Sequence, residues 1–165
     1  MIILGIDPGT ALTGYGIIKT KKDKQAKPDV IDFGCIATDK WLRDGERLKK
    51  IYKDLNKIIE KYNPDVISVE TLYFFKNLKT VMPVSQARGI VLLAAAQKNI
   101  PVMEFTPFQV KITVVGYGRA EKKQVQEMTK KLVNISEFDF KKNNRKKDDA
   151  TDALGVALCA LYKKF

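Results

Sequence analysis

The chain contains no histidine among its 165 residues. This absence excludes serine–histidine and cysteine–histidine nucleophile systems, histidine-ligated zinc, and imidazole as a general base. The two cysteines, Cys35 and Cys159, lie far apart in apolar surroundings and match no metal-ligand or redox spacing, so we expect buried free thiols. Any chemistry must therefore use carboxylates, lysines, hydroxyls or a bound metal.

Long apolar runs, repeats, low-complexity tracts and Gly/Ser linkers are also missing. The longest apolar stretch, residues 89–96, is far too short to cross a bilayer. The first residues lack the charged-then-apolar layout of a signal peptide. We therefore expect a single domain over residues 1–165, in a soluble, cytoplasmic protein without a membrane partner.

Acidic residues are too few to balance the basic ones. Lysine and arginine total 30 against 19 aspartate and glutamate residues, which gives a net charge of +11. Such a surplus attracts polyanions, because each neutralised phosphate releases condensed counterions. The alternative is a generally lysine-rich surface that only keeps the protein soluble, so charge alone leaves both interpretations open.

Hydrophobic periodicity and turn residues predict an α/β protein. The opening apolar runs indicate three antiparallel strands, and apolar residues at helical spacing between Leu48 and Tyr62 indicate the first helix. We expect Pro83 in the first turn of the next helix, where proline is tolerated. The predicted elements are strands at 2–7, 12–19, 29–38, 65–70 and 100–105, and helices at 48–62, 83–99, 121–133 and 149–161. They form a mixed five-stranded sheet flanked by helices, whose later two strands join through right-handed crossovers.

Two segments are predicted to be irregular and basic. Residues 106–123 contain lysine, arginine and glycine without clear periodicity, and residues 141–147 carry five positive side chains. The helix over residues 149–161 is apolar on nearly every side, so we expect it to be buried.

Four acidic residues occupy positions where an acid is costly without a partner. Asp7 and Glu70 each end an apolar strand, and the two strands should lie side by side. Asp149 and Asp152 are three residues apart and share one face at the start of the buried helix. Asp7 could instead merely cap its Pro-Gly turn, and Asp148 and Asp149 could cap the helix.

Convergence of these carboxylates would require a neutralising charge. Oxygen ligands without histidine or cysteine favour Mg²⁺ or Mn²⁺. Two such ions roughly 3.5–4 Å apart can orient an attacking water and stabilise the departing oxygen of a phosphodiester. Basic segments beside the acidic pocket would hold the polyanion that the pocket repels.

An aromatic patch follows the fourth predicted strand. Tyr73, Phe74 and Phe75 are consecutive and precede Lys76 and Asn77. Core packing is the ordinary role of such residues. Three in a row cannot all face one way, so we expect at least one to be exposed.

Several sequence blocks together resemble the bacterial RuvC family of Holliday-junction resolvases, over residues 2 to about 161 and in the order of the family. The blocks are Ile-Leu-Gly-Ile-Asp-Pro-Gly-Thr, Thr-Gly-Tyr-Gly, Val-Glu70, Gln86-Ala-Arg88-Gly, Gln109-Val-Lys111, Thr113-Val-Val-Gly116, Ala120-Glu-Lys122 and Asp149-Ala-Thr-Asp152-Ala-Leu-Gly.

The resemblance implies a ribonuclease-H-like fold, a homodimer, and paired Mg²⁺-dependent nicks in opposite strands of four-way junction DNA. It implies a branch-migration helicase complex as a further partner. By position, the metal-binding catalytic acids are Asp7, Glu70, Asp149 and Asp152, and the lysines near the scissile phosphate are Lys111 and Lys122. Tyr73 falls where the family carries a junction-wedging aromatic, commonly phenylalanine, with Phe74 beside it. Further predicted DNA contacts are Lys76, Asn77, Arg88 and Arg119.

Three alternatives compete with this interpretation. Asp-x-Gly-Thr also opens actin-like ATPases and sugar kinases, but these need a second lobe for which 165 residues leave no room. A catalytically silent junction-binding protein is opposed by the presence of all four acids. A ribonuclease-H-fold nuclease acting on RNA or RNA–DNA hybrids is disfavoured by the aromatic patch and the junction-type blocks.

Overall fold

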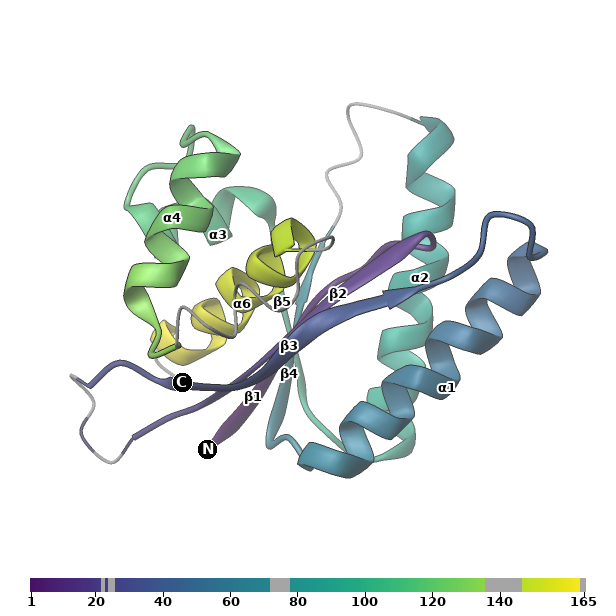
Figure 1. Ribbon diagram of the computed structural model, residues 1–165, viewed down its shortest axis with the longest axis horizontal. Helices are drawn as coiled ribbons and strands as arrows, with labels where there is room; N and C mark the ends of the chain where they lie inside the picture. Colours follow the sequence, from purple (N-terminus) through teal and green to yellow (C-terminus); the bar gives the residue numbers. More distant parts are fainter. Residues whose placement is uncertain (22, 24–25, 72–77, 136–146, 164–165) are drawn as a thin grey trace.

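A mixed sheet of five strands forms the centre of the computed structural model, which describes residues 1–21, 23, 26–71, 78–135 and 147–163. The strands are β1 (Ile2–Asp7), β2 (Leu12–Lys19), β3 (Asp29–Ala37), β4 (Val66–Glu70) and β5 (Val102–Phe105). Their order in the sheet is β3-β2-β1-β4-β5 (Figure 1). The first three pair antiparallel, whereas β4 and β5 continue the sheet parallel to β1. The predicted sheet is thereby confirmed.

Helices cover both faces of this sheet (Figure 1). Within the described residues they are α1 (Asp44–Tyr62), α2 (Leu78–Gln97), α3 (Pro107–Val115), α4 (Lys122–Leu132) and α6 (Lys147–Tyr162). Alternate residues of β1 face opposite sides: Leu4 and Ile6 belong to the core beneath α1 and α2, and Ile3 to the core around α6. α6 lies between the sheet and the α3–α4 pair, and its apolar residues are almost fully buried, as predicted.

The prediction of an irregular segment over residues 106–123 is wrong, because α3 occupies its first half. Thr106 caps this helix: Gln109 N–H donates to Thr106 Oγ1 at 3.2 Å, and Thr106 N–H donates to Gln109 Oε1 at 2.8 Å. Pro107 stands in the first turn, and Gly116 ends the helix with a φ of 79°. These are ordinary helix signals, which the high content of lysine and glycine in the segment obscured.

Two helices begin earlier than predicted. α1 starts at Asp44, where Arg43 N–H donates to Glu46 Oε2 at 3.0 Å and so satisfies one of the free donors of the first turn. α2 starts at Leu78, which places Pro83 inside the helix rather than in its first turn. Proline has no N–H and so removes one helical hydrogen bond, but α2 continues on both sides of Pro83.

The other predicted elements are confirmed with ends displaced by one or two residues. β5 begins later because Asn99, at a φ of 54°, and Ile100 belong to the exit from α2, where Ile100 N–H donates to Ala95 O at 3.0 Å. Residues 141–146 of the predicted basic loop lie outside the described residues, and Lys147 begins α6.

The cysteine prediction is confirmed for Cys159, a buried thiol outside any disulfide, whereas Cys35, also outside any disulfide, is only half-buried. Searching the described part of the chain for a helix long and apolar enough to cross a membrane finds none.

Candidate active site

Two parallel strands bring the first pair of acids together. In the register of β1 and β4, Ile6 lies opposite Val69, so Asp7 and Glu70 are the next residues along the two strands. Both carboxyl groups therefore emerge at the same edge of the sheet, as the sequence predicted. On the other side of β1, Asp7 pairs with Gly14 of β2.

The first two turns of α6 bring the second pair of acids over this edge. The helix can approach closely because β1 and β2 present glycines to it. A Cβ atom on Gly14 would lie 2.2 Å from the carbonyl oxygen of Asp149, and one on Gly5 would lie 2.1 Å from that of Ala153. Any larger residue would push the start of α6 away from the sheet.

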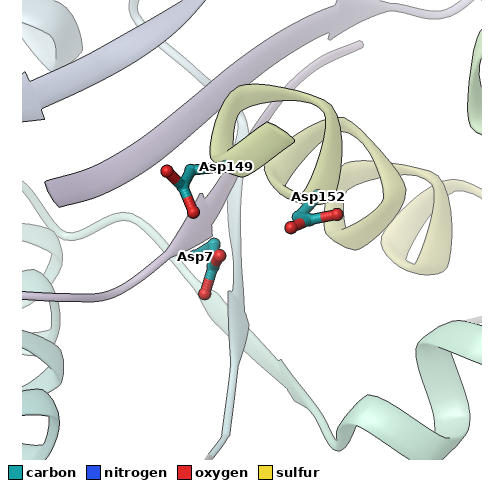
Figure 2. Close-up of side chains that lie close together, drawn as sticks. All are labelled: Asp7, Asp149 and Asp152. Atoms are coloured by element: carbon teal, nitrogen blue, oxygen red, sulfur yellow. The ribbon is translucent and has the colours of Figure 1, made fainter. Parts of the chain in front are cut away.

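Three carboxylates meet at this point (Figure 2). One oxygen atom from each of Asp7, Asp149 and Asp152 lies within 4.8 Å of the other two. Asp7 comes from the end of β1, and the other two come from adjacent turns of α6. Among the described residues Glu70 is not part of this group of three, although it lies beside it.

Glu70 is hydrogen-bonded to Asp7. Burial and the negative charge of Asp7 raise the pKa of Glu70 to about 8. Burial and the charge of Asp152 raise the pKa of Asp7 to about 6, against the opposing effect of the hydrogen bond from Glu70. The two carboxyl groups therefore share a proton near neutral pH and titrate as a pair.

Asp152 is held by two side chains of α4. Lys122 Nζ lies 2.8 Å from its Oδ2, and Gln126 Nε2 donates to its Oδ1 at 3.0 Å. Burial acts to lower the pKa of Lys122, but the hydrogen bond and charge of Asp152 raise it overall. Gln126 Nε2 also lies 3.4 Å from the carbonyl oxygen of Asp148, so α4 is tied to the first turn of α6.

A cavity of about 270 Å³ opens beside these acids. Its polar lining comprises three acids and two lysines, and its apolar lining comes from α3 and α4: Asp7, Glu70, Asp152, Lys111, Lys122, Pro107, Val110 and Val125. Helix α3, which the sequence did not predict, thus brings Lys111 to the acids. The cavity therefore presents both acidic and basic side chains to a ligand.

Comparisons with known proteins show the family of this chain. A family model described as crossover junction endodeoxyribonuclease RuvC matches residues 3–160. The chain belongs to the RuvC family. It is 50% identical over 159 residues to the RuvC of Desulforamulus reducens, covering 96% of this chain and 92% of the relative. It is 47% identical over 158 residues to that of Fusobacterium nucleatum, covering 96% and 78%.

Solved RuvC structures have the same fold. The Thermus thermophilus RuvC structure matches with a TM-score of 0.84 at 28% identity, covering 98% of this chain and 95% of that one. T. thermophilus RuvC in complex with a Holliday junction substrate matches with a TM-score of 0.85 at 28% identity, covering 98% and 94%. The ribonuclease-H-like fold predicted from the sequence is confirmed.

The donor set of this RuvC-family site consists of carboxylate oxygens alone. Such donors suit a hard divalent cation, and Asp7, Asp149 and Asp152 lie close enough to share one. Glu70, which is hydrogen-bonded to Asp7, lies beside these three acids. The acids therefore fit a divalent-cation site, as the sequence predicted.

The predicted DNA contacts fall into three groups. Tyr73, Phe74, Lys76 and Asn77 lie outside the described residues. Arg88 is engaged within the protein: its Nε donates to Glu104 Oε2 at 2.8 Å, and a guanidinium nitrogen contacts the same oxygen. Arg119 is exposed in the connection between α3 and α4.

Two features of the site were not recognised from the sequence. Gln126 stands four residues after Lys122, on the same face of α4, so the spacing could have suggested that both reach one acid. Gly5 and Gly14 could have been recognised as opposite-strand glycines on the face that carries Asp7. The close approach of α6 depends on these glycines within the strands and not on the turn at Pro8 and Gly9.

Proposed function

We propose that this protein is a structure-specific endodeoxyribonuclease that resolves four-way DNA junctions by paired, symmetric nicks. The observation that carries the proposal is the cavity in which a carboxylate cluster from β1, β4 and α6 faces Lys111 of α3 and Lys122 of α4. Membership of the RuvC family supports the same activity.

The chemistry follows from the composition of the cavity. Bound Mg²⁺ ions, two per site and replaceable by Mn²⁺, would supply an activated water and stabilise the departing oxygen. Asp7, Asp149, Asp152 and Glu70 would hold the cations. Their negative charge would repel DNA, and the lysines offset this repulsion at the phosphate. Lys111 has no acidic partner among its described contacts, so it is available to a phosphate oxygen.

Paired nicks require two active sites, and we propose a homodimer through α2. Exposed residues recur on this helix at intervals of four and three, the period of a helix–helix seam: Met82, Gln86, Gly89, Leu93 and Ala96. Met82 is 66% exposed and Leu93 49%. A Cβ on Gly89 would meet nothing within 4 Å, so a second helix could approach closely there. Leu93→Asp should yield a monomer in analytical ultracentrifugation. A variant that stays dimeric would show that the interface lies elsewhere.

The domain and partner predictions complete the proposal. We propose that residues 1–165 form one nuclease domain, because a single sheet organises both cores. A branch-migration helicase complex stays a prediction from the family resemblance.

A synthetic four-way junction with labelled strands tests the function. With Mg²⁺, the protein should produce symmetric nicks in opposite strands, and Asp7→Asn should bind the junction without cutting it. Binding by the wild type without cleavage would leave only the silent junction-binding alternative. Equal cleavage of an RNA–DNA hybrid would favour the hybrid-specific nuclease. Affinity should fall steeply with salt, since phosphate contacts dominate such binding.

The Lys111→Ala variant distinguishes a role of this lysine in cleavage from a role in phosphate binding alone. Because Lys111 lines the acidic cavity, its removal should lower single-turnover cleavage more than it weakens junction binding. Arg119→Ala, which removes a positive charge from an exposed predicted DNA contact outside the cavity lining, is the comparison, and it should weaken junction binding and cleavage together. Equal loss of binding and cleavage in Lys111→Ala would show that this lysine only anchors phosphate.

A further inference from the structure

The only tryptophan of the chain, Trp41, is 81% exposed in the connection between β3 and α1. Tryptophan is enriched at interfaces because its large ring contributes most when it is covered, so this exposed ring is a candidate contact. The ring lies outside both hydrophobic cores, and the fold does not use it.

The backbone under this ring is fixed by hydrogen bonds. Trp41 N–H donates to Asp39 Oδ1 at 3.0 Å, and Leu42 N–H donates to Asp39 O at 3.2 Å, which closes a turn. The first turn of α1 follows immediately, capped by Glu46. The tryptophan is therefore presented at a defined position.

The same connection is joined to the turn that follows Asp7. Thr38 N–H donates to Ala11 O at 3.0 Å, and Thr38 Oγ1 donates to Thr10 O at 2.5 Å. Thr10 is three residues after Asp7, and Trp41 is three residues after Thr38. With about 3.8 Å between consecutive Cα atoms, Trp41 lies within about 30 Å of Asp7, or about nine nucleotides of a DNA strand.

One basic side chain contacts the ring, and a second stands close to it in the sequence. Lys40 Nζ lies 4.7 Å from the centroid of the Trp41 ring, and Arg43 is exposed on the other side in sequence. Three acids stand close in the sequence: Asp39 accepts from Trp41 N–H, Glu46 accepts from Arg43 N–H, and Asp44 is exposed in the first turn of α1. An exposed aromatic ring with basic side chains nearby is a combination that binds single-stranded nucleic acid, by stacking on a base and attracting its phosphates.

We propose that Trp41, with Lys40 and Arg43, is a second DNA contact, which packs its ring against a nucleotide of the arm that crosses this edge of the sheet. The proposal rests on the proposed function, because that function brings DNA to the edge. It adds a contact on the side of the sheet covered by α1 and α2, away from the lysines of α3 and α4 (Figure 1).

Intrinsic fluorescence tests the contact without any substitution, since Trp41 is the only tryptophan. The wild-type chain would be titrated with a four-way junction in EDTA, with acrylamide as the quencher and a mobility shift as an independent measure of binding. The quenching constant should fall at least twofold at saturation. Binding with an unchanged quenching constant overturns the contact while leaving the proposed function intact. Absence of any junction binding overturns both.

Substitutions of Trp41 and Lys40 provide a second test of the contact. Trp41→Ala should weaken junction binding about tenfold, whereas Trp41→Phe, which keeps a ring, should retain most of it. Lys40→Ala should weaken binding more than Lys53→Ala, which removes the same charge from an exposed position further along α1. Wild-type affinity of the Trp41→Ala variant for the junction would overturn the proposal. Protection of Trp41 from acrylamide that rises with protein concentration in the absence of DNA would also overturn it, because the ring would then be covered by another protein molecule.

Discussion

Lys122 and Gln126, one turn apart on α4, each engage one oxygen of Asp152. Lys122 Nζ lies 2.8 Å from Oδ2, and Gln126 Nε2 lies 3.0 Å from Oδ1. A divalent cation that bound Asp152 would compete with the lysine for the carboxylate, whereas the amide could keep its hydrogen bond to the other oxygen. Substitutions of the two side chains should therefore have different effects on cation binding and cleavage.

Replacement of Lys122 by methionine should separate cation binding from catalysis. The variant keeps an unbranched side chain only one atom shorter but removes the ion pair, so Mn²⁺ affinity should stay equal or rise a few-fold. Cleavage should fall by at least about tenfold, because the positive charge beside the phosphate is lost. Calorimetric Mn²⁺ titration and single-turnover cleavage measure the two effects. The neighbouring Lys123→Met is the control, and parallel losses of affinity and cleavage in Lys122→Met would contradict competition.

Gln126→Leu should weaken both cation binding and cleavage. The amide orients Asp152, and loss of such an outer partner of a metal ligand typically costs about 10- to 100-fold in affinity or activity. Mn²⁺ affinity by calorimetry, cleavage, and junction binding in EDTA would be compared. Junction binding should change little, since Gln126 is half-buried and donates to Asp152 within the protein. Glu127→Gln, on the exposed side of α4, is a control expected to behave as the wild type.

Gly14→Ala should displace the start of α6. The added Cβ would lie 2.2 Å from Asp149 O, a backbone atom that can move only with the helix. We expect a loss of about 1–3 kcal/mol in the free energy of unfolding, and weaker Mn²⁺ binding because Asp149 and Asp152 move with α6. Chemical denaturation and calorimetry measure these changes.

Gly45→Ala is the matched control for that substitution. A Cβ at this position in the first turn of α1 would meet nothing within 4 Å. Its effect should lie between neutral and a stabilisation of about 1 kcal/mol. Equal stability and equal cation affinity in the Gly14 and Gly45 variants would show that the start of α6 tolerates displacement.

The sequence alone was sufficient to place the acids, because simple periodicities govern them. Asp7 and Glu70 end apolar strands, and Asp152 interrupts a helix that is otherwise apolar. It was not sufficient for Gln126 or Gly14, because a glutamine on an exposed helix and a glycine in a strand are compatible with many roles. Their function depends on the distance between α6 and its neighbours, which only tertiary packing determines.

Helix α3 illustrates a different kind of failure. Thr106, Pro107, Gln109 and Gly116 carry the local signals for its two ends, so the information was present in the sequence. The helix is only nine residues long and has buried residues only at Val110 and Val114, which gives a weak periodic pattern. The resemblance assigned Lys111 to the site without the helix that positions it, and the structure places this lysine in the lining of the cavity.

The shared proton of Asp7 and Glu70 predicts an unusual pH dependence of stability. The pKa of Glu70 is raised from 4.5 to about 8 and that of Asp7 from 3.8 to about 6, so the folded state binds more protons than the unfolded state between these values. Their contribution to stability is full below pH 4 and is lost as the pH rises through 8. In EDTA, the melting temperature should therefore fall between pH 6 and pH 8.5.

This direction is opposite to the general electrostatic expectation. The chain carries a net charge of +11, and a rise in pH lowers this charge and its self-repulsion, which by itself would stabilise the fold. Asp7→Asn should flatten the fall, because the charge of Asp7 is one cause of the raised pKa of Glu70. A wild-type melting temperature that rises with pH in EDTA, with the same slope as Asp7→Asn, would contradict a shared proton.

Cation binding should reverse the effect and release the proton. Mg²⁺ or Mn²⁺ needs ionised carboxylates, so its affinity should increase from pH 6 to pH 8.5 and its stabilisation of the fold should increase with it. At pH 7, calorimetric titration in two buffers of different ionisation enthalpy should show about one proton released per site. Asp7→Asn should release less than the wild type. A binding enthalpy that is independent of the buffer would mean that Asp7 and Glu70 are already ionised before the cation arrives.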